Sequence, residues 1–226
     1  MSTIFFEKKR FLYLAGCQVL SAFLLLVLLY AAYAGRAIKV EHNKAFYFVV
    51  STNAHIEVST HEARLDGGAG YFLDREGQAY VAWSVYLSEA DGQAVQAALA
   101  DKTQLLTIRL PHLYFKTRTE KSKRYLVEGA LQSLYGCIEV LAETVARLDN
   151  GLPQGACRRL LATLQRQVTY LEGAYRESYT QFAQLCGWVG EHLQEIEKKT
   201  IFSKDLRYLL CGVCEGYIDL TMEFSL

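Results

Sequence analysis

The sequence predicts an α+β protein in three parts: an N-terminal transmembrane helix, a small βαββαβ domain and a C-terminal antiparallel helical bundle. Three patterns predict this fold class: a long uncharged run, an aromatic and β-branched region with turn signals, and a heptad spacing of apolar residues. The expected boundaries are 1–35 for a cytoplasmic stub and transmembrane helix, 36–44 for a linker, 45–112 for the α+β domain and 113–226 for the bundle.

The uncharged run covers residues 11–34 and is long enough to span a membrane. A hydrocarbon core of about 30 Å needs roughly 20 apolar residues in a helix. Cations at positions 8–10 precede the run, and by the positive-inside rule they favour an N-terminus inside the cell and extracytoplasmic C-terminal domains. Two alternatives remain open: a signal peptide cleaved after residues 32–34, or a buried helix of a soluble protein. The sequence therefore predicts a single-pass cell-membrane protein.

The overall composition argues against one class of partner. Lys plus Arg and Asp plus Glu both number 24, so there is no excess of positive charge to hold a nucleic acid. The chain has only two prolines and no low-complexity tract, so long disordered segments are not expected.

Residues 45–110 alternate between strand and helix signals. Aromatic and β-branched runs favour strands, and Gly67-Gly68 and a turn ending at Gly77 interrupt them. Ser88 is a suitable N-cap for a helix, and Pro111 ends the last run. The expected strands are 45–50, 70–73, 79–87 and 105–110, with helices within 51–66 and 88–101. This order is the split βαβ arrangement.

Residues 70–99, GYFLDREGQAYVAWSVYLSEADGQAVQAAL, resemble the second half of a SPOR domain, the peptidoglycan-binding module of bacterial division and sporulation proteins. In that family a hairpin strand runs into a helix of the form S-x-x-D/E-A. The first strand departs from the family pattern, because Val49 and Ser51 stand where Gln and Gly are usual. The resemblance implies a non-enzymatic cell-envelope protein that binds peptidoglycan glycan strands during sporulation or cell division.

The alternation of side chains along a strand predicts where such a glycan would bind. One parity is expected to cover the two helices of the domain: Phe46, Phe48, Val50, Val81, Trp83, Val85, Leu87, Leu106, Ile108 and Leu110. The other parity is expected on an open face, which the resemblance makes the glycan-binding face. The predicted glycan-binding residues on it are Tyr47, Tyr80, Ser84, Tyr86 and Arg109. Aromatic rings and hydrogen-bonding groups on a shallow surface suit sugar rings.

The C-terminal part shows apolar residues at alternating spacings of four and three, which is typical of packed helices. The first such series is Val127, Leu131, Leu134, Ile138, Leu141, Val145 and Leu148. Turn signals follow it at 149–153, and Ser203 begins the last helix after a second break. Short loops between long helices predict an antiparallel three-helix bundle. A dimerising parallel coiled coil is the alternative.

The Cys211-Gly-Val-Cys214 motif is the main candidate for other chemistry. It could be redox-active or half of a zinc site, but no second pair accompanies it. Cysteines on these helices also serve as small buried hydrophobes, and their pairing is left open. The sequence predicts no catalytic residue, no metal site and no cofactor. The alternative to glycan binding is a protein-interaction scaffold whose bundle docks a partner, and a thiol- or metal-dependent enzyme is the third hypothesis.

Overall fold

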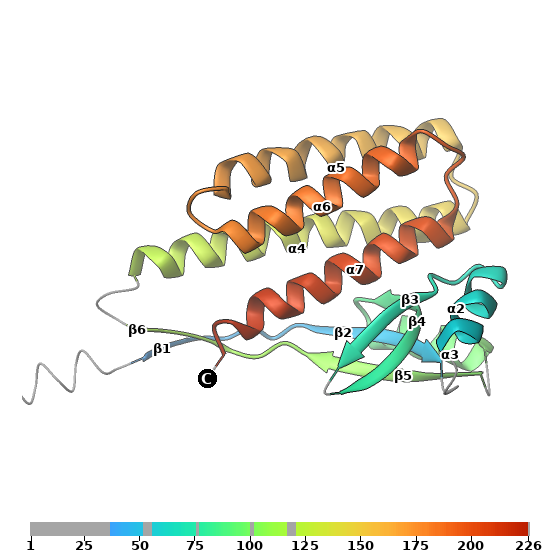
Figure 1. The fold of residues 1–226 in the computed structure, drawn as a ribbon, viewed down its shortest axis with the longest axis horizontal. Helices are drawn as coiled ribbons and strands as arrows, with labels where there is room; N and C mark the ends of the chain where they lie inside the picture. The colour runs from blue at the N-terminus through green and yellow to red at the C-terminus, as the bar shows by residue number, and fades with distance from the viewer. Residues whose placement is uncertain (1–36, 52–55, 76, 100–101, 117–120, 226) are drawn as a thin grey trace, which may run out of the picture.

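The protein is described by a computed structural model that covers residues 37–51, 56–75, 77–99, 102–116 and 121–225. These residues form six helices and two small sheets. A helical layer lies over a four-stranded sheet, and a two-stranded ribbon extends from the sheet beneath the ends of two long helices (Figure 1).

The helical layer has one helix more than the sequence predicts. Its members are α4 (Lys121–Asp149), α5 (Gln154–Tyr175), α6 (Thr180–Glu197) and α7 (Ser203–Met222). The sequence predicts a single helix between the turn at 149–153 and Ser203, but this helix is broken between α5 and α6, where the spacing of apolar residues slips. The aromatic ring of Tyr179 in this break stacks on that of Phe182, with the centroids 5.7 Å apart. The three-helix bundle is therefore corrected to four helices.

The heptad series predicted for the first of these helices is confirmed by burial. Leu134 and Ile138 are completely buried in α4, and the other members except the partly buried Leu148 are at most 7% exposed. Their partners lie on α5 and α7, which both pack against α4.

The element order predicted for residues 45–110 is also confirmed. The strands are β2 (Ala45–Ser51), β3 (Tyr71–Arg75), β4 (Gln78–Tyr86) and β5 (Thr103–Arg109), and the helices are α2 (Ile56–Leu65) and α3 (Glu89–Leu99). The sheet has the order β3-β4-β2-β5, and every neighbouring pair is antiparallel.

Both faces of this sheet are covered, so the predicted helix-free face is wrong. On one face, Val49, Val81 and Trp83 pack with Ala63 under α2 and α3. On the other face, the buried residues belong to the same core as the bundle, and α7 lies across β4 and β3. The run 45–50 has apolar side chains at both parities, which is the pattern of a strand buried on both sides.

Two strands were not predicted from the sequence. They are β1 (Ala37–Val40), within the expected linker, and β6 (Leu113–Lys116), at the expected start of the bundle. They pair with each other in antiparallel register and form the ribbon at the left of Figure 1. The segments 37–51 and 103–116 therefore run side by side, first as the ribbon strands β1 and β6 and then as the sheet strands β2 and β5.

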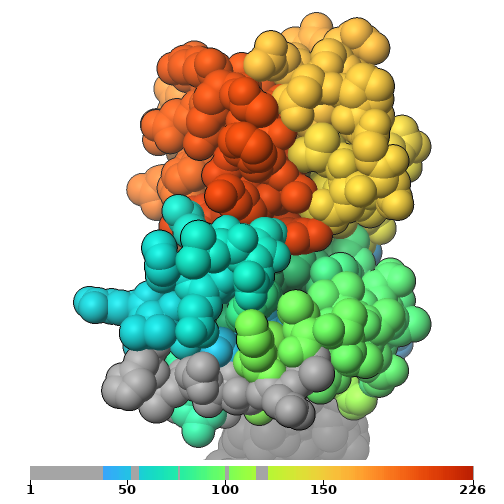
Figure 2. All heavy atoms as spheres, turned by 90° about the vertical axis from the view of Figure 1, so that its right-hand side faces the viewer, coloured from blue at the N-terminus to red at the C-terminus, as the bar shows by residue number. Residues whose placement is uncertain are grey.

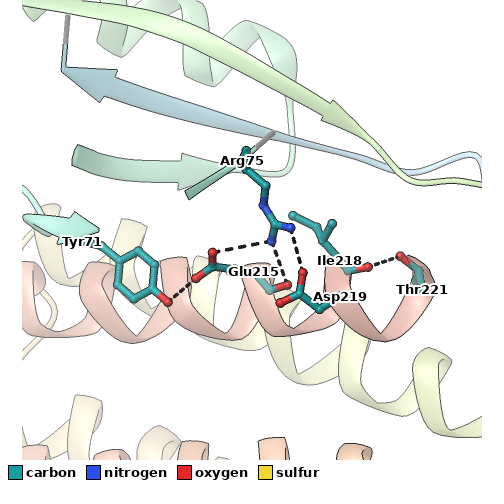
Figure 3. Close-up of polar contacts among 6 residues, drawn as sticks. All are labelled: Tyr71, Arg75, Glu215, Ile218, Asp219 and Thr221. Carbon is teal, nitrogen blue, oxygen red and sulfur yellow. Dashed lines mark hydrogen bonds and ion pairs between the residues drawn. The ribbon is translucent and has the colours of Figure 1, made fainter. Parts of the chain in front are cut away.

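Polar contacts hold the edge of the sheet on α7 (Figure 3). The Tyr71 hydroxyl donates a hydrogen bond of 2.5 Å to Oε2 of Glu215. The Arg75 guanidinium lies 2.7 Å from Oδ1 of Asp219 and donates a 3.3 Å hydrogen bond to the Glu215 carbonyl oxygen. Burial raises the pKa of Glu215, and the Tyr71 hydrogen bond and Arg75 oppose that shift. These contacts fix β3 at one position along α7.

The predicted fold class and localisation need a correction in their membrane part. Within the described ranges, which begin at residue 37, no helix is both long enough and apolar enough to cross a membrane. The fold is therefore a mixed α/β arrangement, and the single-pass membrane assignment with extracytoplasmic C-terminal domains is contradicted. The segment 11–34, on which that assignment rests, lies outside the described residues.

Truncation of the heptad core should destabilise the protein strongly. Leu134 is completely buried in α4, so Leu134→Ala is expected to lower the free energy of unfolding by roughly 2–5 kcal/mol through lost burial and a residual cavity. Val140→Ala is the matched control, because Val140 lies on the same helix but is 39% exposed. Chemical denaturation measures both values, and equal losses would contradict the assignment of the core.

Candidate functional site

The structure separates the five residues predicted to bind glycan. Tyr47 and Tyr86 are direct cross-strand partners, and Arg109 follows on the adjacent strand with the same parity as Tyr47. Ser84 is 3% exposed and shares a hydrogen bond with Tyr86. Tyr80 projects from the opposite face, where its hydroxyl donates to Gln78.

An irregularity in β4 explains why Tyr80 is displaced. Val49 pairs with Ser84, whereas the next residue, Val50, pairs with Ala82, so Trp83 is an extra residue in the strand. A bulge of this kind shifts the alternation of side chains by one position. Residues before and after Trp83 at the same parity therefore face opposite sides of the sheet.

A second irregularity lies between the ribbon and the sheet, where basic residues come together. Val40 pairs with Leu113 and Ala45 pairs with Arg109, so the four residues 41–44 oppose the three residues 110–112. The Leu110 N–H still donates to the Lys44 carbonyl oxygen at 2.9 Å. Pairing then stops at Pro111, because proline has no N–H to donate. Extra residues often re-aim side chains in this way beside functional sites.

A cavity of about 510 Å³ opens beside this irregularity, and we call it the bulge cavity. It is lined by His42, Asn43, Lys44, Ala45, Tyr47, Leu87, Arg109, Leu110, His112 and Tyr135. Two of the predicted glycan-binding residues, Tyr47 and Arg109, are thus among its lining residues. Tyr135 comes from α4, so the cavity lies where the sheet meets the bundle.

The side chains of the bulge cavity are held by specific contacts. Nε2 of His42 lies 2.9 Å from the hydroxyl of Tyr217 on α7. The backbone N–H of His42 donates to Nδ1 of His112 at 3.4 Å. The Lys44 ammonium lies over the ring of Tyr135, 2.9 Å from its centroid. The connecting segments 41–44 and 110–112 and the helices α4 and α7 therefore contribute to one cluster of basic and aromatic groups.

The charges in this cluster affect one another. Burial lowers the pKa of His42, and the nearby Lys44 and His112 lower it further. Burial also lowers the pKa of Lys44, while Glu139 opposes that shift. The arrangement can bind a ligand through positive charge and aromatic surface.

A second hollow lies between α3 and the C-terminal half of α4, and we call it the α3–α4 groove. Leu87 lines both this groove and the bulge cavity. In Figure 2 the end of the bundle near residue 150, in yellow, lies directly above α3, in green. The groove has a volume of about 610 Å³. It is lined by Ser84, Val85, Tyr86, Leu87, Ser88, Asp91, Ala94, Val95, Glu139, Ala142, Glu143, Val145, Ala146, Asp149, Asn150, Arg207 and Leu210.

The Cys211–Cys214 pair lies in the protein core, where a thiol cannot be reached by a substrate from solution. Both thiols are completely buried in α7, and burial is the main cause that raises the pKa of each. Cys137, Cys157 and Cys186 are also buried and free. Among the residues that the structure covers, no group of three or more His, Cys, Asp or Glu side chains could hold a metal ion. The geometry therefore favours the reading of these cysteines as core residues.

Sequence reasoning did not find the bulge cavity. His42 and Lys44 lie in the stretch interpreted as a linker, and His112 lies about seventy residues away in sequence. In the sequence, Pro111 indicates only the end of a strand, whereas in the structure its missing N–H also interrupts the pairing of the two chain segments. The only signal in the sequence is one histidine after the segment that forms β1 and another before the segment that forms β6. Two histidines about seventy residues apart are too weak a signal to predict a site.

Comparisons with known proteins add no relative. No family model, no curated protein and no solved structure matches the chain. The resemblance to SPOR domains therefore stays a prediction, and so does peptidoglycan binding.

The bulge cavity predicts a pH dependence of stability. The pKa of folded His42 lies below its ordinary value of 6.5, so the unfolded chain binds this proton more tightly. The stability that neutral His42 contributes is present above about pH 6.5 and is lost as the pH falls through the folded pKa. His42→Gln should therefore show a smaller decrease in unfolding free energy than the parent between about pH 7.5 and pH 5.5.

Chemical denaturation at the two pH values measures this difference. Tyr217→Phe is the control, because it removes the hydroxyl partner of His42 and keeps the imidazole. This variant should be less stable at both pH values and should still lose stability on acidification. An unchanged pH dependence in His42→Gln would show that His42 is not the group responsible.

Proposed function

We propose that this protein is a non-enzymatic interaction domain, and that the α3–α4 groove binds a cationic, apolar segment of a partner protein. The observation that supports this function best is the chemistry of the groove, which combines an apolar floor with an acidic rim. Grooves of this kind bind amphipathic helices through apolar anchors and complementary charge.

The floor of the groove is formed by aliphatic side chains from four elements. Val85 comes from β4, Val95 from α3 and Leu210 from α7. Ala142 and Ala146 come from α4 and lie one helical turn apart, on the same side of the helix. Small side chains at these two positions leave space for a bound backbone to approach α4 closely.

The rim of the groove is predominantly acidic. Its carboxylates are Asp91, Glu139, Glu143 and Asp149, against a single cation, Arg207. Arg207 is engaged already, because it lies 2.6 Å from Oδ2 of Asp149. Glu143 pairs with Arg147 on its own helix. In the part of the chain that the structure describes, Asp91 and Glu139 have no ion pair, so the rim can attract Lys or Arg of a partner.

The covered sheet favours this function over glycan binding on an open face. Helices α2 and α3 cover one side of the sheet, and the bundle covers the other. A glycan strand would therefore reach the sheet only at its margins, for example at Tyr47 and Arg109 in the bulge cavity. Because this margin could still contact a glycan strand, peptidoglycan binding remains the second hypothesis.

A peptide-binding experiment tests the proposal. The probe is a fluorescent amphipathic helix of about 14 residues that carries Leu on one face and Lys on the other. We expect the parent protein to bind this probe, and Ala146→Arg to weaken binding by about 10-fold or more, because it fills the groove and reverses its charge. Ala174→Arg is the matched control, since Ala174 is exposed on α5, away from the groove.

Two results would contradict the proposal. One is equal affinity of the parent and Ala146→Arg for the probe. The other is equal affinity of the parent for a control peptide in which Glu replaces Lys. Sedimentation with purified peptidoglycan is measured in parallel. The glycan hypothesis would be favoured instead if the parent does not bind the peptide, and if the parent and Ala146→Arg sediment equally with peptidoglycan.

A further inference from the structure

We propose that the bulge cavity is a binding site for a phosphorylated small molecule. This site is separate from the α3–α4 groove, although Leu87 lines both. The inference rests on the basic side chains of the lining, on an exposed guanidinium and on the construction of the cavity.

The lining of the bulge cavity is rich in basic side chains. Four of its ten residues, His42, Lys44, Arg109 and His112, are basic, and none of the ten is acidic. The carboxylate that acts on Lys44 is that of Glu139. Glu139 does not line this cavity, but it lines the α3–α4 groove and, with Glu128, an adjoining pocket on the other side of His42 and Lys44. In a chain with equal numbers of acidic and basic residues, such a concentration of one sign marks a local preference for anions.

Arg109 is the residue that distinguishes this cavity from a structural ion-pair cluster. Its side chain is exposed at the end of β5. Throughout the described ranges, it forms no hydrogen bond or ion pair with another residue. An arginine fork donates two parallel hydrogen bonds to a phosphate group, and a free guanidinium at the mouth of a cationic cavity is available for this contact.

The other basic side chains are held in place without a ligand. The ring of Tyr135 supports the Lys44 ammonium, and the contacts of His42 with Tyr217 and His112 position the two imidazoles. Little ordering is therefore needed when an anion binds, which favours affinity. A phosphate, with its several oxygens and up to two negative charges, matches this number of donors better than a single carboxylate does.

The size and the remaining lining indicate what the phosphate is attached to. A volume of about 510 Å³ lies within the range of about 300–1,000 Å³ that small-molecule sites occupy. Tyr47 offers an aromatic ring, and Leu87 and Leu110 offer aliphatic surface. The ligand class is therefore a phosphate ester that carries a ring, such as a sugar phosphate or a nucleotide.

Calorimetric titration at neutral pH and low ionic strength tests the proposal. The first probe is inorganic pyrophosphate, followed by glucose 6-phosphate and ADP. We expect the parent to bind pyrophosphate and at least one organic phosphate. Arg109→Gln and Lys44→Gln should each weaken binding by about 10-fold or more. Arg166→Gln is the matched control, because Arg166 is exposed on α5, contacts only its own helix and should not affect binding.

Circular dichroism and thermal unfolding show whether the variants keep the fold. Arg109→Gln removes no side-chain hydrogen bond to any residue that the structure describes, so its structure should match that of the parent. The groove variant Ala146→Arg should keep phosphate binding, so the two proposed sites can fail independently. The proposal is overturned if the parent binds none of the three probes at about 10 mM, or if Arg109→Gln and Lys44→Gln bind them as the parent does.

Discussion

The rest of the structure depends on the packing of a sheet that is apolar on both faces against helix α7. Phe46, Phe48 and Leu73 are completely buried, and they share one core with the helical bundle. Each such side chain contributes about 1.5–3 kcal/mol when it is removed from water. Without α7 this face would be exposed, since α2 and α3 cover only the opposite face. Tyr217 of α7 joins the two layers, because its ring packs edge-on against that of Phe46.

Both candidate sites lie along the seam that this packing creates. Where the strands pair regularly, side chains of the sheet pack directly against those of α7. Where it is interrupted, at residues 41–44 and 110–112, the bulge cavity opens beside Tyr135. Where β4 ends and the chain turns into α3, the α3–α4 groove opens. The two hollows differ in charge, because one receives its cations from the sheet side and the other its carboxylates from α3 and α4.

Much of the local structure could be predicted from the sequence, but the way in which layers and sites assemble could not. The spacing of Leu134 and Ile138 indicates a buried helix face whatever that face packs against. Alternation in β4 misleads because Trp83 is an extra residue, and no local signal marks it. The run 45–50 predicts a strand, and its apolar side chains at both parities indicate burial on both faces, but they do not say which helices cover each face. The bulge cavity joins His42 to His112, and such a long-range pairing leaves no periodic pattern.

The central claim is that the sheet and the bundle form a single cooperative unit. The chain has two tryptophans, Trp83 in the sheet and Trp188 in α6. In Trp188→Phe, fluorescence reports on the sheet alone, while far-ultraviolet circular dichroism is dominated by the helices. The account predicts that the two signals change together through one denaturation transition. Two separate midpoints, with the Trp83 signal lost before the helices unfold, would contradict it.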